Sequence, residues 1–156
     1  MNIEEKVNAI IGYLLAETAE EKEDAISKLR NENTKNKTVN DAEKAIESIL
    51  CEIGMPEHIK GHRYCTSAIK AAVENPDIID AITVELYPSV AKKFNTTGSR
   101  VERGIRFGIE LAWDRCDANV IERYFGSTIS ARRGRPTNSE FIARIANIVR
   151  GLVDNA

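Results

Sequence analysis

Apolar residues recur at helical spacing along almost the whole chain, and no stretch of useful length alternates as a strand would. The first stripe consists of Ile3, Val7, Ile10, Ile11, Leu14 and Leu15. The last consists of Phe141, Ile142, Ile145, Ile148 and Val149. No internal repeat has the period of a solenoid. The periodicity therefore predicts an all-α fold.

The first third of the chain divides into a helical pair and a polar segment. Asn2 and Glu5 have the spacing of a capping box, and Thr18 and Glu21 repeat it where a second helix is expected. Residues 31–38 contain no apolar side chain, which predicts a linker. We expect a helical pair over residues 1–33, a linker over 34–38 and a main domain over 39–156. The pair is too small to bury its own stripe, so we expect it to dock on the main domain or to form a homodimer.

The main domain is expected to contain further helices. One stripe runs from Ala42 to Ile53, where Gly54 and Pro56 stop it. The helices expected after it span residues 64–73, 77–86, 89–94, 99 to about 114, and 118–125, and a final helix is capped by Asn138 or Ser139.

Composition limits the class of protein. With 156 residues and 42% apolar composition, the chain can form a core without a metal ion or a disulfide. No apolar run approaches the ~18 residues of a membrane span, and the acidic N-terminus is unlike a secretory signal. Cys51, Cys65 and Cys116 form an odd, sparse set that fits reduced thiols. We expect a cytoplasmic protein that does not contact a membrane.

Charge is distributed unevenly along the chain. Residues 1–50 carry 7 basic and 11 acidic side chains, net −4, and residues 51–86 carry 3 and 6, net −3. Residues 87–156 carry 12 and 7, net +5. A basic C-terminal half favours contact with a polyanion, and a solvated surface on which charges happen to segregate is the alternative.

Residues 89–106 have the form of a helix-turn-helix. Ala91 supplies the small residue that a close helix crossing needs, and Asn95 and Gly98 tolerate the backbone angles of a tight turn. Ser99 and Glu102 have capping-box spacing at the start of the second helix. Such a motif predicts DNA binding, although the same geometry is common in all-α proteins generally.

The second helix of this motif has two contrasting faces. Its apolar face carries Val101, Ile105, Gly108 and Ala112, and its polar face carries Glu102, Arg103, Arg106 and Glu110. In a major groove, arginine donates to guanine O6 and N7, and glutamate accepts from cytosine N4. Lys92, Lys93 and Arg100 lie around the motif. Arg132, Arg133 and Arg135 form a second basic cluster, for which a solvated loop is the alternative.

Four strings are similar to the effector-domain family of the stage-zero sporulation response regulators. They are IGMPEHIKGHRY (53–64), LYPSVAKKFNTTGSRVERGIR (86–106), IELAW (109–113) and GRPTNSEFIARIA (134–146). The resemblance covers about residues 39–153. It implies a six-helix, all-α domain that binds double-stranded DNA at TGTCGAA-type boxes, often as tandem dimers.

The resemblance also implies residue roles. Base reading falls on Glu102, Arg103 and Arg106. Phosphate contacts fall on Lys92, Lys93, Ser99, Arg100, Arg133 and Arg135.

Two departures from the family alter what we expect of regulation. Some 38 residues precede the match, too few for a receiver domain, so we expect no phosphorelay control in cis. Residues 116–129 correspond to the region that engages the RNA polymerase sigma factor in the family. Here Asp117 and Glu122 add charge, which predicts weaker activation and a repressor or competitor of the full-length regulator.

Metal binding and catalysis are not expected. Cys51, His58, His62 and Cys65 are four soft ligands, but their spacing is not that of a zinc finger or ribbon. A structural role for His58 and buried thiols explains them more simply. No phosphate-binding glycine loop, nucleophile elbow or cofactor motif is present, so we predict a protein that is not an enzyme.

Two functional hypotheses remain open. The first is a sequence-specific transcriptional regulator. The second is a protein-interaction module or antagonist that binds the full-length regulator or RNA polymerase rather than DNA.

Overall fold

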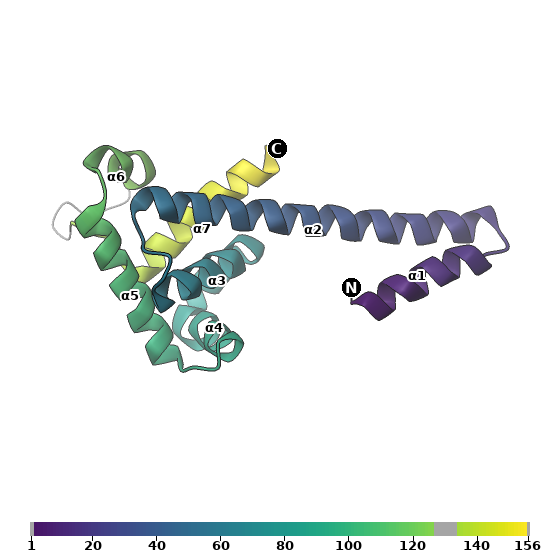
Figure 1. Ribbon diagram of the computed structural model, residues 1–156, viewed down its shortest axis with the longest axis horizontal. Coiled ribbons are helices and arrows are strands. Elements are labelled where there is room, and N and C mark those ends of the chain that lie inside the picture. Colours follow the sequence, from purple (N-terminus) through teal and green to yellow (C-terminus); the bar gives the residue numbers. More distant parts are fainter. Residues whose placement is uncertain (1, 127–133, 156) are drawn as a thin grey trace. The chain divides into compact units, whose positions relative to one another are not determined.

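The computed structural model describes residues 2–126 and 134–155 (Figure 1). Its helices are α1 (Ile3–Leu15), α2 (Ala19–Ile53), α3 (Lys60–Glu74), the 3-10 helix η1 (Pro76–Ala81), the π-helix η2 (Ile82–Leu86), α4 (Tyr87–Lys93), α5 (Gly98–Arg115), α6 (Ala118–Phe125) and α7 (Asn138–Asp154). No strand occurs among the described residues, and the all-α prediction is confirmed. Within the same residues, no helix is both long and apolar enough to cross a membrane.

The chain forms two compact units, Met1–Asp41 and Ala42–Ala156. Helix α2 contributes to both. All of its buried residues, from Ala42 to Ile53, belong to the second unit. Gly54, at φ +87°, ends the helix where the sequence predicted a stop, because this backbone conformation suits glycine best.

The linker predicted over residues 34–38 is wrong. These residues lie inside α2, and the hydroxyls of Thr34 and Thr38 donate to the carbonyls of Arg30 and Thr34 at 3.0 and 2.9 Å. The segment contains neither glycine nor proline, so nothing in its backbone breaks a helix. The absence of apolar residues indicates only that this stretch of helix is exposed.

The first and the last helix, α1 and α7, each begin with a capping box. In α1, Asn2 Oδ1 accepts from the Glu5 amide and Glu5 Oε2 accepts from the Asn2 amide, both at 2.8 Å. In α7, Thr137 and Glu140 make the same reciprocal bonds at 3.3 Å. The capping box at Asn2 is therefore confirmed, whereas the cap assigned to Asn138 or Ser139 is wrong by one or two residues.

The core of the second unit lies where α3 packs against α5 and α7, with α4 against α5 (Figure 1). Trp113 packs its ring on Phe125 and Phe141, with centroids 5.0 and 6.2 Å apart. The apolar stripe of α7 is buried: Phe141, Ile142, Ile145 and Val149 are fully inaccessible to solvent. The helix predicted from this stripe is confirmed.

Helices α3 and α5 approach each other through two glycines. A Cβ placed on Gly61 would lie 2.1 Å from the carbonyl oxygen of Gly104. A Cβ on Gly104 would meet the Tyr64 ring at 2.9 Å. Two backbones can cross this closely only without side chains between them. The pair therefore fixes where α5 lies on the rest of the unit.

Candidate nucleic-acid interface

The turn between α4 and α5 has the geometry of a helix-turn-helix. Asn95 has φ +51°, as predicted for the turn, and the Thr96 amide donates to the Ala91 carbonyl at 2.9 Å. Thr97 caps α5 by accepting from the Arg100 amide at 3.3 Å, so the cap predicted at Ser99 is wrong. Gly98 begins α5 in a conformation open to other residues, so its expected role in the turn is not confirmed.

Helix α5 presents one buried and one exposed face. Val101, Ile105 and Ala112 are completely buried, and Gly108 is buried against Met55. Arg103 and Arg106 are exposed on the other side of the helix. The predicted division of the helix into two faces is thus confirmed. The buried face holds the helix on its domain while the two arginines remain accessible to a ligand.

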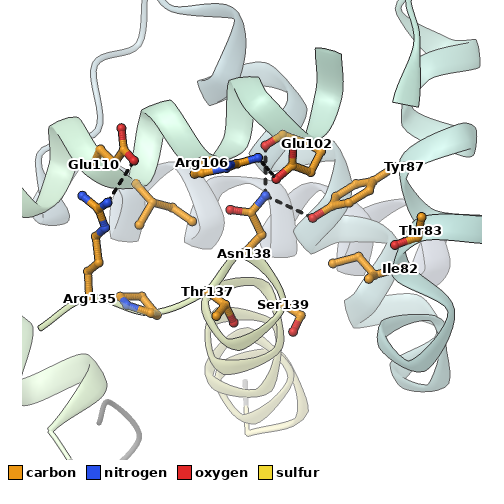
Figure 2. A pocket seen from close by; sticks show the side chains of 12 residues that line it. Ile82, Thr83, Tyr87, Glu102, Arg106, Glu110, Arg135, Thr137, Asn138 and Ser139 are labelled. Carbon is orange, nitrogen blue, oxygen red and sulfur yellow. Dashed lines mark hydrogen bonds and ion pairs between the residues drawn. The ribbon is translucent and has the colours of Figure 1, made fainter. Parts of the chain in front are cut away.

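The exposed face of α5 carries paired charges. Arg106 forms an ion pair with Glu102 one turn earlier, and Arg135 pairs with Glu110 at 3.1 Å. These side chains line an open cleft of about 590 Å³ beside the start of α7 (Figure 2). Figure 2 shows the two pairs side by side along the same edge of α5.

Asn138 connects α7 to the helix-turn-helix. Its amide nitrogen donates to the Tyr87 hydroxyl and to the Glu102 carbonyl, both at 3.0 Å (Figure 2). Burial raises the pKa of the Tyr87 hydroxyl above its ordinary value. Sequence reasoning assigned Asn138 to a helix cap and missed this link, because the contact joins residues far apart in the chain.

The residues predicted to contact phosphate lie on α5 and around it. Lys92 and Lys93 are exposed at the end of α4, and Ser99 and Arg100 are exposed in the first turn of α5. Arg63 was not predicted, yet it is exposed on α3, and its guanidinium carbon lies 5.8 Å from the centre of the Phe94 ring, on which Lys93 also packs. Arg132 and Arg133 lie outside the described residues. The predicted phosphate-contacting residues that the structure describes therefore come from α4, α5 and the segment before α7.

The region expected to meet a sigma factor, residues 116–129, is described only as far as Gly126. Asp117 caps α6, its carboxylate accepting from the Asn119 amide at 2.7 Å. Its charge therefore has a structural use. Glu122 is exposed.

The four soft ligands considered for zinc do not form a site. Cys65 is fully buried, and burial raises the pKa of its thiol, whereas Cys51 is exposed. No group of three or more histidine, cysteine or acidic residues among those described is placed to hold a metal ion. The structural role predicted for His58 is wrong because that side chain is exposed, and the buried histidine is His62.

Comparison with known families gives a match over most of the second unit. Residues 46–149, two thirds of the chain, match the family model described as the sporulation initiation factor Spo0A C terminal. The match begins inside α2, includes α3 to α6 with the helix-turn-helix, and ends inside α7. This family comprises DNA-binding regulatory domains rather than enzymes. The chain therefore belongs to the family of the C-terminal effector domain of the sporulation initiation factor Spo0A.

Proposed function

We propose that this chain is a sequence-specific transcriptional regulator that reads TGTCGAA-type boxes in double-stranded DNA with α5. The observation that carries the proposal is the placement of Arg103 and Arg106. Both are exposed on a helix whose opposite face, at Val101 and Ile105, is completely buried. A rigidly held helix with accessible arginines in its first turns suits major-groove recognition.

Glu102 is the third base-reading residue in this proposal. Its ion pair with Arg106 holds both side chains on the exposed face before DNA arrives. Arg106 then donates to a guanine, and Glu102 accepts from a cytosine amino group. A carboxylate at this position also repels phosphate and disfavours bases without a donor, so it contributes to specificity.

Phosphate contacts position the reading helix. Lys92, Lys93, Ser99, Arg100 and Arg135 are exposed around α5. We assign the same role to Arg133, beyond the described residues. Such contacts supply affinity that falls with salt and carry little sequence information. A protein with this function acts at the chromosome, in the cytoplasm.

A binding titration tests the proposal. The full chain is titrated into a TGTCGAA-containing duplex and a scrambled duplex of equal length at one salt concentration. We expect the specific duplex to bind at least about 10³-fold more tightly. Arg103→Ala should remove much of this preference, whereas Arg115→Ala, an exposed arginine at the far end of α5, should retain it.

Equal affinity for the two duplexes in the wild-type protein would contradict the proposal. It would favour a module that binds the full-length regulator or RNA polymerase instead of DNA.

A further inference from the structure

The apolar face of α1 is left uncovered. None of the residues of this helix is buried. Ile3, Leu14 and Leu15 are 83%, 72% and 74% exposed, and Val7, Ile10 and Ile11 are 44–48% exposed. An amphipathic helix in water normally covers such a face, so an occupant for it is expected.

Helix α2 does not cover this face within the first unit. The groove between α1 and α2 is lined by Glu21, Asp24, Ala25 and Lys28 from α2 and by mostly small or polar residues from the α1 side. The residues on that side are Asn8, Ala9, Gly12 and Leu15 of α1 and Ala16, the C-cap of the helix. Because the small side of α1 lines this groove, most of its large side chains remain available to another surface.

The uncovered side chains have the spacing of a coiled-coil seam. Ile3, Val7, Ile10 and Leu14 follow one another at intervals of four, three and four residues. Two helices with this pattern can pack the side chains of one between those of the other. The face therefore suits a second copy of itself.

The exposed part of α2 has a charge pattern that also complements itself. Residues 20–24 carry four acidic side chains and one basic one, net −3. Residues 28–37 carry four basic side chains and one acidic one, net +3. In an antiparallel pair each segment lies opposite its counterpart of opposite sign, whereas a parallel pair places like charges together.

The two patterns share one centre. The middle of the α1 seam lies between Val7 and Ile10, and the middle of the charged stretch 20–37 lies at Lys28. Asn8 and Lys28 line the same groove, so both centres lie at one level of the helical pair. A single twofold axis at this level can therefore match the apolar seams and the opposite charges together.

We infer that α1 and the exposed first part of α2 form an antiparallel homodimer interface. The occupant of the apolar face is a second copy of this chain, related by a twofold axis near Val7, Ile10 and Lys28. A lipid surface fits less well, because the only charged residues of α1 are Glu4, Glu5 and Lys6, whereas helices that bind anionic membranes are rich in lysine and arginine.

Light scattering on the full chain without DNA measures the association. At micromolar concentration we expect twice the 17.4 kDa mass of the chain. Ile10→Lys and Leu14→Lys should each give the monomer mass, because lysine forms helices well but cannot be buried in the seam. Val84→Lys is the matched control, since Val84 is 74% exposed but lies in η2 of the other unit, and it should remain dimeric.

Mixing variants tests the antiparallel arrangement. In an antiparallel seam Val7 lies opposite Ile10, so Val7→Glu mixed with Ile10→Lys should restore the dimer. A mixture of Ile10→Glu with Ile10→Lys should stay monomeric, because those positions meet only in a parallel pair.

A monomeric wild-type chain would overturn the inference, as would a dimer that survives both α1 substitutions. Restoration by the pair of Ile10 variants instead of the Val7 and Ile10 pair would overturn the antiparallel arrangement.

Discussion

Helices α1 and α7 start from the same sequence pattern. Each begins with a capping box, Asn2 with Glu5 and Thr137 with Glu140, and each carries an apolar stripe at helical spacing. Yet the stripe of α7 packs into the core, with Phe141 completely buried, whereas Leu14 on α1 is 72% exposed. Helical periodicity therefore shows which face of a helix is apolar, whereas contacts with other helices determine whether that face is buried.

The largest expected difference between the two helices is in stability. Phe141→Ala should reduce the free energy of unfolding by about 3–5 kcal/mol, because a fully buried ring leaves a cavity. Leu14→Ala should change the free energy of unfolding of the second unit by less than about 0.5 kcal/mol, because Leu14 belongs to the first unit. Denaturant titration followed by the fluorescence of Trp113, which packs on Phe141, measures both. A comparable loss for Leu14→Ala would show that α1 docks on its own domain.

The second comparison is between a glycine of the second unit, Gly61, and a glycine of α1, Gly12. Gly61→Ala should cost about 1–3 kcal/mol, because its Cβ would meet the Gly104 backbone and force α3 and α5 apart. Gly12→Ala in α1 meets no atom within 4 Å and should favour that helix by up to about 1 kcal/mol. Thermal unfolding followed by circular dichroism measures both variants. A neutral Gly61→Ala would mean that the two helices do not cross at this point.

The third comparison concerns the two caps. Thr137→Ala should destabilise the second unit by about 1 kcal/mol, because the start of a helix packed in the core loses its hydrogen bond. Asn2→Ala should fray α1 and leave the Trp113 transition unchanged. Hydrogen exchange at the first amides of each helix, beside the denaturant titration, separates local fraying from global unfolding. A shift of the global transition by Asn2→Ala would contradict this division.

The smallest expected effect is electrostatic. Lys70 donates to Glu43 at 2.8 Å between α3 and α2, and this bond lowers the carboxyl pKa below its ordinary value of 4.5. A carboxyl group whose pKa is lower in the folded state than in the unfolded state stabilises the fold at pH values above the unfolded-state pKa. This stability is lost as the pH falls through the folded-state pKa. Both side chains are partly exposed, so Glu43→Gln should cost less than about 1 kcal/mol at pH 7 and nothing in strong acid.

Stability measured across this pH range tests the effect. Asp24→Asn, which removes an exposed pair with Lys28 inside one helix of the first unit, is the control and should leave the stability of the second unit unchanged. Equal behaviour of the two variants would contradict the role given to the contact between helices.

Local signals in the sequence were sufficient for much of the fold. The stop at Gly54, the cap at Asn2 and the buried face of Val101 and Ile105 depend on neighbours a few residues away, and all were predicted. The continuity of α2 through residues 34–38 was not predicted, because a linker and an exposed stretch of helix can have the same polar composition. A helix ends where its backbone is interrupted, and polarity alone does not interrupt it.

The site was predictable in its parts but not in its arrangement. The arginines of α5 can be identified from the sequence by their charge and their spacing along one helix. Asn138 bonds to Tyr87 and to Glu102, which lie 51 and 36 residues earlier in the chain. The closely approaching Gly61 and Gly104 are 43 residues apart. No periodic pattern marks such contacts, because they depend on how the helices cross.

The most direct test of DNA reading by α5 compares Arg106→Ala with Lys92→Ala on the TGTCGAA-type and scrambled duplexes over a range of salt concentrations. Arg106→Ala should weaken binding to the specific box by about 1–3 kcal/mol and leave the scrambled duplex less affected. Lys92→Ala should weaken both duplexes alike and reduce the salt slope by about one charge. If the two variants lose the same affinity on both duplexes with the same change in slope, α5 is not the reading helix.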